Sequence, residues 1–188
     1  MFKEIFLRLM DLIFKPAEAW SSVSGEDGEH EAFLSRYIYP LAGMIALSAF
    51  VGVLFNRKEF DFVIALKSTI MAAVSSLGGF FLGACLLNEL WRGMFNRAKD
   101  MKLCQFFTGY ASAIMFLLEI VLSLLPEFFF LRILVLYTAY IIWEGAIPFM
   151  QVNENEQLKF TICASAVIML SPFAVYFALF LLMPGMRF

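Results

Sequence analysis

The chain has 188 residues, of which 62% are hydrophobic and 16% are charged, and its mean hydropathy is +0.81. Soluble domains have about 45–50% apolar and about 25% charged residues, so the composition excludes an ordinary soluble domain and predicts an integral membrane protein. The net charge is −2 and no basic stripe is present, which argues against nucleic acid as a partner. A single histidine and three cysteines without CxxC spacing predict no metal site and no cofactor.

The N-terminal region, residues 1–35, is expected on the cytoplasmic side. Residues 1–15 predict an amphipathic helix that ends at Lys15-Pro16. Such a helix suits the plane of the membrane surface, and packing against the protein's own loops fits the pattern equally well. Trp20 is expected as an interfacial anchor. The polar face of the helix carries four charged residues, namely Glu4, Arg8, Asp11 and Lys15.

Residues 21–32 predict a polar, acidic linker. Four carboxylates and His30 lie within residues 26–31 and could in principle hold a divalent cation. They lack the alternating ligand spacing and the closing glutamate of an EF-hand loop. A solvated linker is therefore favoured over a metal site.

Residues 36–188 predict an all-α bundle of five transmembrane helices. The second span contains Ser68–Asn88, an uncharged stretch that is long enough to cross a bilayer, for which about 20 residues are needed. Pro172 is expected to kink the fifth span. The spans are expected at about 37–55, 62–90, 106–125, 128–150 and 160–183.

One face of the second span carries small residues. Ser75, Gly79 and Gly83 fall four apart in the sequence, so a helix places them on one side. Small residues at this spacing let two membrane helices approach closely, which predicts a packing face. The alternative is that small residues are simply common in membrane spans.

The distribution of Lys and Arg predicts the orientation. With the N-terminus inside, nine of these residues lie on the inner side and five on the outer side. We therefore expect a multi-pass protein of the cell membrane with its N-terminus in the cytoplasm and its C-terminus outside.

Several stretches together resemble the Yip1 domain family of five-span membrane proteins. The family's Gly-Tyr segment often has a proline a few residues later, and Ile114-Met115-Phe116 has none. The long N-terminal extension of eukaryotic members is also absent, so the chain resembles a prokaryotic member. The resemblance implies a five-span fold, and eukaryotic members are associated with vesicle trafficking and small GTPases. The stretches are Lys15-Pro16-Ala17-Glu18-Ala19-Trp20, Tyr37-Ile38-Tyr39-Pro40-Leu41, Gly78-Gly79-Phe80, Gly109-Tyr110-Ala111, Tyr137-Thr138-Ala139-Tyr140 and Glu144-Gly145.

Ionisable residues at membrane depth predict two groups of interacting side chains, because a charge in hydrocarbon is costly and marks a functional candidate. On the outer side, Glu119 has Lys67 and Arg132 as candidate partners for an ion pair or triad. On the cytoplasmic side, a structural polar network, a polar headgroup or ion site and a proton-coupling site remain open. The cytoplasmic candidates are Glu89, Arg92, Tyr110 and Glu144.

The sequence favours a protein that is not an enzyme and acts in membrane organisation or trafficking. Its expected partners are membrane lipids, a second protein or further copies of itself. The alternative is a small transporter or channel that uses the intramembrane carboxylates, possible as an oligomer. Protease or phosphatase chemistry needs an activated nucleophile or a metal, and neither a Ser–His nor an HExxH arrangement occurs.

Overall fold

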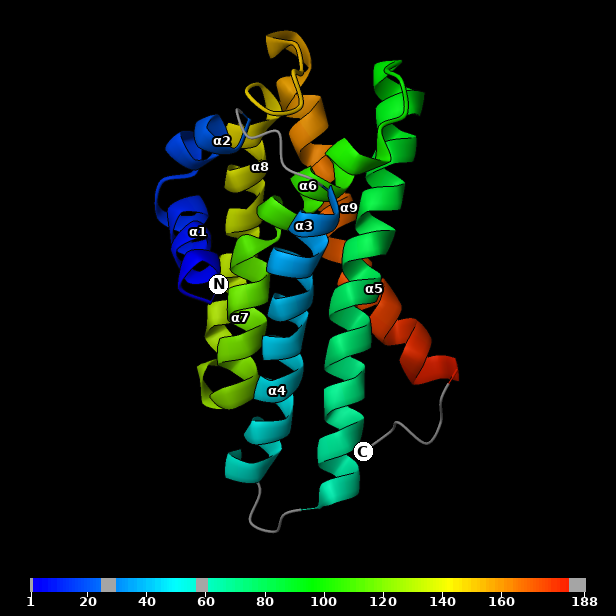
Figure 1. Cartoon of the computed structure of the whole chain (residues 1–188). Helices are drawn as coiled ribbons and strands as arrows, with labels where there is room; N and C mark the ends of the chain where they lie inside the picture. Colours follow the sequence, from blue (N-terminus) through cyan, green and yellow to red (C-terminus); the bar gives the residue numbers. More distant parts are fainter. Residues whose placement is uncertain (1, 25–29, 57–60, 183–188) are drawn as a thin grey trace.

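The computed structural model describes residues 2–24, 30–56 and 61–182, and this part of the chain is helical with no strand. The helices form an elongated bundle (Figure 1). We call the end with α2, α3 and α6 the upper end, and the end with Asn56 and Phe62 the lower end. The elements are α1 (Phe2–Phe14), α2 (Pro16–Ser24), α3 (His30–Phe33), the π-helical η1 (Leu34–Ile38), α4 (Tyr39–Asn56), α5 (Phe62–Phe95), α6 (Met101–Ala111), α7 (Ala113–Leu124), the 3₁₀-helical η2 (Pro126–Tyr137), α8 (Thr138–Ala146) and α9 (Glu154–Leu182).

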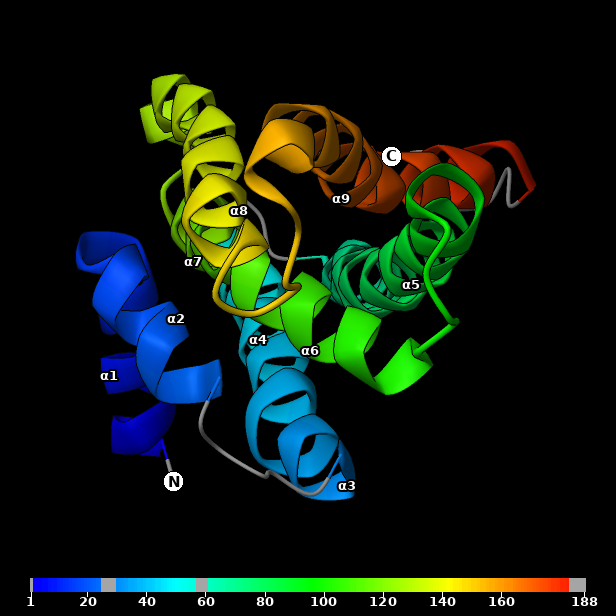
Figure 2. The same cartoon turned by 90° about the horizontal axis from the view of Figure 1, so that it is seen from above.

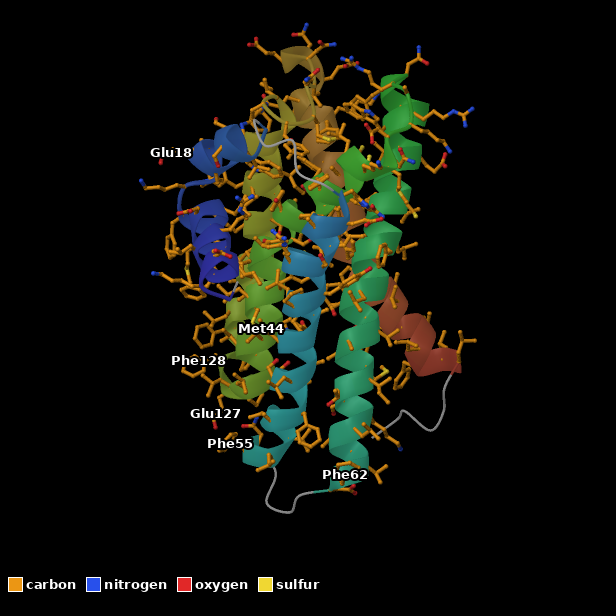
Figure 3. The ribbon with its side chains drawn as sticks, viewed as in Figure 1. Glu18, Met44, Phe55, Phe62, Glu127 and Phe128 are labelled. Atoms are coloured by element: carbon orange, nitrogen blue, oxygen red, sulfur yellow. The ribbon has the colours of Figure 1, made fainter. Side chains whose placement is uncertain are left out.

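Four continuous helical segments are long and apolar enough to cross a membrane, and the bent pair α6–α7 makes a fifth if it counts as one span. The continuous segments are His30–Asn56, Phe62–Phe95, Pro126–Ala146 and Glu154–Leu182. The all-α membrane bundle expected from the sequence is thus confirmed. Figure 3 shows Phe55 and Phe62 at the lower end, with Glu127 and Phe128 above Phe55.

The third predicted span differs from the prediction because it is broken. Its helix begins at Met101, earlier than expected, and bends by 47° between α6 and α7. Ser112 lies at the break, and its hydroxyl donates to the Thr108 carbonyl at 2.7 Å. Serine side chains that bond to the preceding turn commonly bend helices, so the bend has a local cause.

The first span also begins earlier than predicted, at His30, and passes through Pro40 without a break. Proline lacks the N–H and its ring collides with the carbonyl four residues before it. Just before Pro40 the helix takes the wider π form of η1, in which the Tyr39 N–H donates to the carbonyl of Leu34, five residues earlier. The π-turn relieves the collision, which is why the helix continues.

The fourth span begins with η2 rather than with an α-helix. A 3₁₀-helix rises about 2.0 Å per residue, so η2 covers about 24 Å with few residues. Its side chains include no buried residue, and Phe129 and Ile133 are 72% and 70% exposed. The prediction that this helix continues to residue 150 is wrong. It ends at Ala146, and Val152 donates its N–H back to the Ala146 carbonyl in a turn that includes Gln151 at positive φ.

The N-terminal region contains more helix than predicted. The amphipathic helix ends at Phe14 as expected, but α2 extends to Ser24 and α3 begins at His30, so part of the predicted linker is helical. Residues 25–29 of that linker, with three of its carboxylates, lie outside the described residues. The apolar face of α1 packs against the bundle, and its three central side chains, Ile5, Leu9 and Leu12, are buried.

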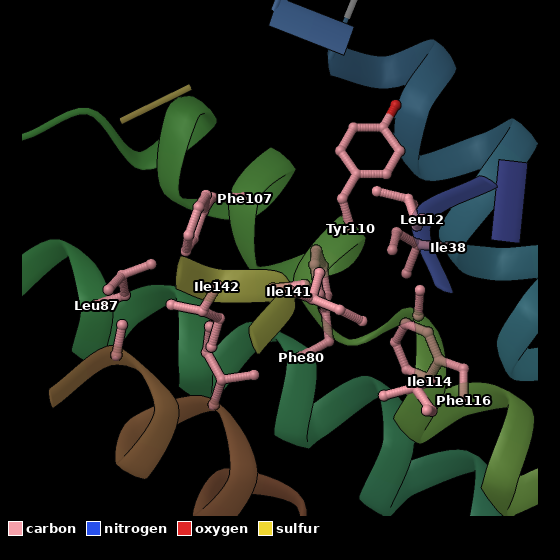
Figure 4. Close-up of a cluster of buried hydrophobic side chains, with 14 of the residues drawn as sticks. Leu12, Ile38, Phe80, Leu87, Phe107, Tyr110, Ile114, Phe116, Ile141 and Ile142 are labelled. Carbon is pink, nitrogen blue, oxygen red and sulfur yellow. The ribbon is translucent and has the colours of Figure 1, made fainter. Parts of the chain in front are cut away.

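Trp20 is a core residue, so its expected role as an interfacial anchor is wrong. The side chain is fully buried, its Nε1–H donates to the Ile141 carbonyl at 2.9 Å, and its ring stacks on Phe107. A Cβ at Gly145 would overlap the indole ring, so the glycine creates the space that the ring fills. This contact fixes α2 against α8. Figure 4 shows part of the same apolar core, with Ile141 and Phe80 near its centre, Phe107 on one side and Tyr110 on the other.

The long helices α5 and α9 pack against each other near the middle of the bundle. A Cβ at Gly79 would overlap Pro172, and one at Gly83 would come within 2.8 Å of the Ser171 hydroxyl. Val175, which follows Pro172 on α9, still packs against Gly78 of α5, and the end of α9, red in Figure 2, then extends away from the bundle. Its side chains there are mostly exposed, with Phe177 at 60% and Leu182 at 79%.

The contact between Gly145 and Trp20 predicts a large effect of one methyl group. We expect Gly145→Ala to lower the free energy of unfolding by about 1–3 kcal/mol, because the added Cβ must displace the ring. The control is Gly93→Ala on α5, where an added Cβ would have no atom within 4 Å apart from the adjacent backbone of its own helix. It should be neutral or stabilising by up to about 1 kcal/mol, since alanine favours a helix. SDS titration in detergent measures the free energy of unfolding of both variants. Equal changes in this free energy would contradict the packing role of Gly145.

Candidate functional site

A polar cavity of about 720 Å³ lies at the upper end of the bundle. Its walls come from α1, the α3–η1 segment, α6 and the loop after α8. Three cationic and two acidic side chains line it. These residues are Arg8, Arg36, Lys102, Glu4 and Asp100.

Two tyrosines form part of the wall of the polar cavity. Tyr110 accepts a hydrogen bond from Arg8 Nη1 at 3.1 Å, and the Arg8 guanidinium also lies over the Tyr110 ring at 5.7 Å from its centroid. Tyr37 packs its ring against Phe33 and Tyr110. Its hydroxyl is buried and has no hydrogen-bond partner among the described residues. A buried hydroxyl without a partner is costly, so this group requires an explanation.

The second cavity, which we call the apolar cavity, has a volume of about 530 Å³ and lies among α4, α5, α7, η2 and α9. Its inner wall consists of buried side chains such as Ile45, Phe80 and Ile168. Its outer wall is exposed at Leu136 on η2 and at Phe173 on α9. The cavity therefore opens sideways between η2 and α9, where the surrounding surface is apolar.

The inner wall of the apolar cavity contains serine hydroxyls. Each donates to a carbonyl of its own helix, as Ser76 does to Ala73 at 3.1 Å and Ser171 does to Ile168 at 3.1 Å. These oxygens keep lone pairs that can accept a hydrogen bond. A mostly apolar pocket with a few convergent polar groups is the usual form of a small-molecule site.

Of the three outer-side residues, the structure brings Glu119 and Arg132 together. Both line the apolar cavity, and the Arg132 charge acts on Glu119. They form no ion pair within 4 Å in the described part of the chain. Lys67 lines none of the cavities described here and is not among the charges that act on Glu119. Glu119 also lines a smaller cavity of about 290 Å³ between α4, α5 and α7.

The cytoplasmic-side candidates are not joined into one network by the contacts found among the described residues. Glu89 is exposed and pairs with Lys99, and Arg92 is exposed nearby. Glu144 has Tyr140 as its hydrogen-bonding neighbour one turn earlier on the same span. Tyr110 is the member that reaches a cavity. Glu89 and Arg92 on α5 are exposed, whereas Glu144 on α8 is half-buried beside Tyr140, so the two helices offer separate surroundings to these candidates.

The residues that distinguish the polar cavity were not identified from the sequence. Lys102 is far in the chain from Arg36 and Tyr37, and only folding brings it to the same cavity. A weak signal existed, since Arg36 directly precedes the stretch Tyr37–Leu41 that carries the family resemblance. No group of three potential metal ligands occurs in residues 2–24, 30–56 and 61–182.

Comparison with protein-family models gives one match. The model of the Yip1 domain matches residues 10–182, nearly the whole chain. The chain belongs to the Yip1 family. Together with the apolar helices, this identifies a multi-pass membrane protein. Neither the curated proteins nor the solved structures contain a match. The Yip1 family is not known for enzymatic activity.

Four of the six stretches that suggested the Yip1 family from sequence lie next to each other in space, namely those with Trp20, Tyr37, Tyr110 and Gly145. Trp20 fills the space at Gly145, and Phe33 fills the space at Gly109, where a Cβ would overlap its ring. Tyr37 contacts Tyr110, the neighbour of that glycine. Short motifs with little specificity of their own therefore form one packing centre beneath the polar cavity.

The absence of an ion pair between Glu119 and Arg132 among the described residues predicts weak coupling of their charges. In a double-mutant cycle of Glu119→Gln and Arg132→Gln, we expect a coupling free energy below about 1 kcal/mol, because the charges interact without contact. SDS titration measures the free energy of unfolding of the wild type, the two single variants and the double variant. A single variant that loses about 3–5 kcal/mol, as when one partner of a buried ion pair is removed, would contradict this expectation. Lys67→Gln combined with Glu119→Gln serves as the control pair.

Proposed function

We propose that this Yip1-family protein has no catalytic activity and acts in membrane organisation or trafficking by binding a membrane lipid in the apolar cavity. The observation that carries the proposal is the sideways opening of that cavity between η2 and α9. A lipid chain can enter from the bilayer without crossing a polar surface. The volume of about 530 Å³ lies within the usual range for ligand pockets, about 300–1,000 Å³.

The polar groups of the cavity suit an amphiphile. Glu119 and Arg132 place opposite charges near the rim without neutralising each other by contact. An acidic and a basic group held apart in this way can bind an amine and a phosphate of one zwitterionic headgroup. Each charge would then gain a partner at membrane depth, where an unpaired charge is costly.

A transporter that uses carboxylates receives less support. Such a protein needs polar groups that continue from one side of the membrane to the other. Glu119 lines cavities, whereas Glu89 is exposed and paired with Lys99 and Glu144 neighbours Tyr140. These three carboxylates therefore do not form a continuous path, and a bound lipid explains the apolar cavity better.

The lipid proposal predicts that blocking the cavity removes a bound lipid. Ser76 lines the cavity and is buried, so Ser76→Phe should fill the space with its ring. The control is Val74→Phe, which adds a ring on the exposed side of the same helix. After release from nanodiscs, native mass spectrometry should show retained lipid with the wild type and Val74→Phe, and at least about tenfold less with Ser76→Phe. Equal retention by both variants would refute the proposal.

The orientation is a second part of the proposal. The Lys and Arg distribution places the upper end in the cytoplasm. In a variant with Cys85, Cys104 and Cys163 replaced by alanine, we introduce Asn153→Cys at the upper end or Glu127→Cys at the lower end, both exposed. A membrane-impermeant maleimide should label Glu127→Cys on intact cells, and Asn153→Cys only after permeabilisation. The reverse pattern would overturn the orientation.

A further inference from the structure

The polar cavity contains a set of groups that the proposed lipid site does not use. Arg36 and Lys102 line it, and both side chains are exposed to it. Neither has an ion pair or a hydrogen bond among the described residues. Arg36 comes from η1 and Lys102 from the first turn of α6, so two segments far apart in the sequence bring positive charge to one opening.

The hydroxyl of Tyr37 is the most informative of these groups. Tyr37 lines the cavity and is 5% exposed, and its hydroxyl is buried with no hydrogen-bond partner among the described residues. Its electrostatic neighbours are Tyr110 and Arg8, which also line the cavity. The ring is fixed by Phe33 and Tyr110, so the hydroxyl is held in place before any ligand arrives. Such a group is an available donor for an oxygen-rich anion.

The acidic residues of the wall do not cancel this preference. The Asp100 carboxylate accepts the Leu103 N–H at 3.0 Å, where it caps α6. The partial positive charge at the start of a helix stabilises a carboxylate in that role. Glu4 lies on α1 and has interactions of its own. The cationic groups of Arg36 and Lys102 therefore remain to attract an anion.

We propose that the polar cavity is a binding site for a phosphate-bearing anion. Arg36 and Lys102 supply the charge, and the Tyr37 hydroxyl donates a hydrogen bond to a phosphate oxygen. Arg8 holds α1 at the wall through Tyr110. The phosphate belongs either to the headgroup of an anionic lipid or to a free phosphate compound, because both present the same oxygens to these residues. The site is separate from the apolar cavity, so it stands whether or not a lipid binds there.

The experiment measures binding by thermal shift to the full chain in dodecyl maltoside, carrying Ser76→Phe so that the apolar cavity is blocked and lipid binding there does not contribute. The probes are dioctanoyl-phosphatidylglycerol, dioctanoyl-phosphatidylcholine as the neutral lipid, and inorganic phosphate, with ionic strength held constant by sodium chloride. We expect phosphatidylglycerol to stabilise the protein and phosphatidylcholine to do so much less. Stabilisation by inorganic phosphate as well would identify a free phosphate as a sufficient ligand. Stabilisation by phosphatidylglycerol alone would identify the headgroup.

Two variants distinguish binding of the anion at the polar cavity from non-specific attraction to the positive charges of the protein. Arg36→Gln should raise the apparent Kd about tenfold, because a charge-assisted hydrogen bond is lost. Arg92→Gln removes an exposed cation outside the cavity and should leave the Kd unchanged. Equal effects of these two variants, or equal stabilisation by the two lipids, would overturn the proposal. If Arg36→Gln does not fold, Lys102→Gln replaces it.

Tyr37→Phe gives the sharpest result. Removing a hydroxyl that has no partner in the protein should leave the Tm without ligand unchanged or higher. The same variant should weaken binding of the anion severalfold, because a donor is lost. A structural hydroxyl would give the opposite pattern, namely a lower Tm and unchanged binding, and that result would overturn the assignment of Tyr37.

Discussion

The insertion of Trp20 beside Gly145 is the contact on which the arrangement of the upper end depends. The indole Nε1–H reaches the Ile141 carbonyl, and the ring stacks on Phe107. An indole can be buried fully only where its N–H finds an acceptor and where the opposing chain leaves space. One side chain therefore joins α2, α6 and α8. Because α1 is continuous in sequence with α2, the same contact positions α1 at the wall of the polar cavity.

Interruptions of regular α-helix shape the middle of the bundle. The π-turn before Pro40, the bend at Ser112, the 3₁₀ winding of η2 and Pro172 in α9 lie on four different spans. Straight helices would pack along their whole length. Here α9 packs against α5 as far as Val175, which contacts Gly78, and its last turns are mostly exposed, whereas η2 contains no buried side chain. Membrane helices tolerate such interruptions where neighbouring groups satisfy the backbone, and the apolar cavity lies between them.

The two cavities differ in chemistry because they lie at different levels of the bundle. At the upper end, loops and helix ends bring charged side chains together, and the cavity there is lined by cations, acids and tyrosines. In the middle, only small and apolar side chains can pack between spans, so the cavity walls are apolar and its few polar groups are serines and the pair Glu119 and Arg132. The first site suits a phosphate at the membrane surface, and the second suits a chain from the bilayer.

The sequence by itself determined the membrane class, the all-α architecture, the approximate positions of the spans and the family. Runs of apolar residues about 20 long have few alternatives in a bilayer, so hydropathy alone identifies them. The packing centre was present in the sequence as short motifs, but the role of Trp20 was misread, because an indole suits an interface and a core equally. The tertiary structure alone decided which charges meet. Glu144 and Glu89 are both expected on the cytoplasmic side yet have separate neighbours, since the side of the membrane does not specify the direction in which a side chain points around its helix. For the same reason, only the fold brings Arg36, Tyr37 and Lys102 to one wall.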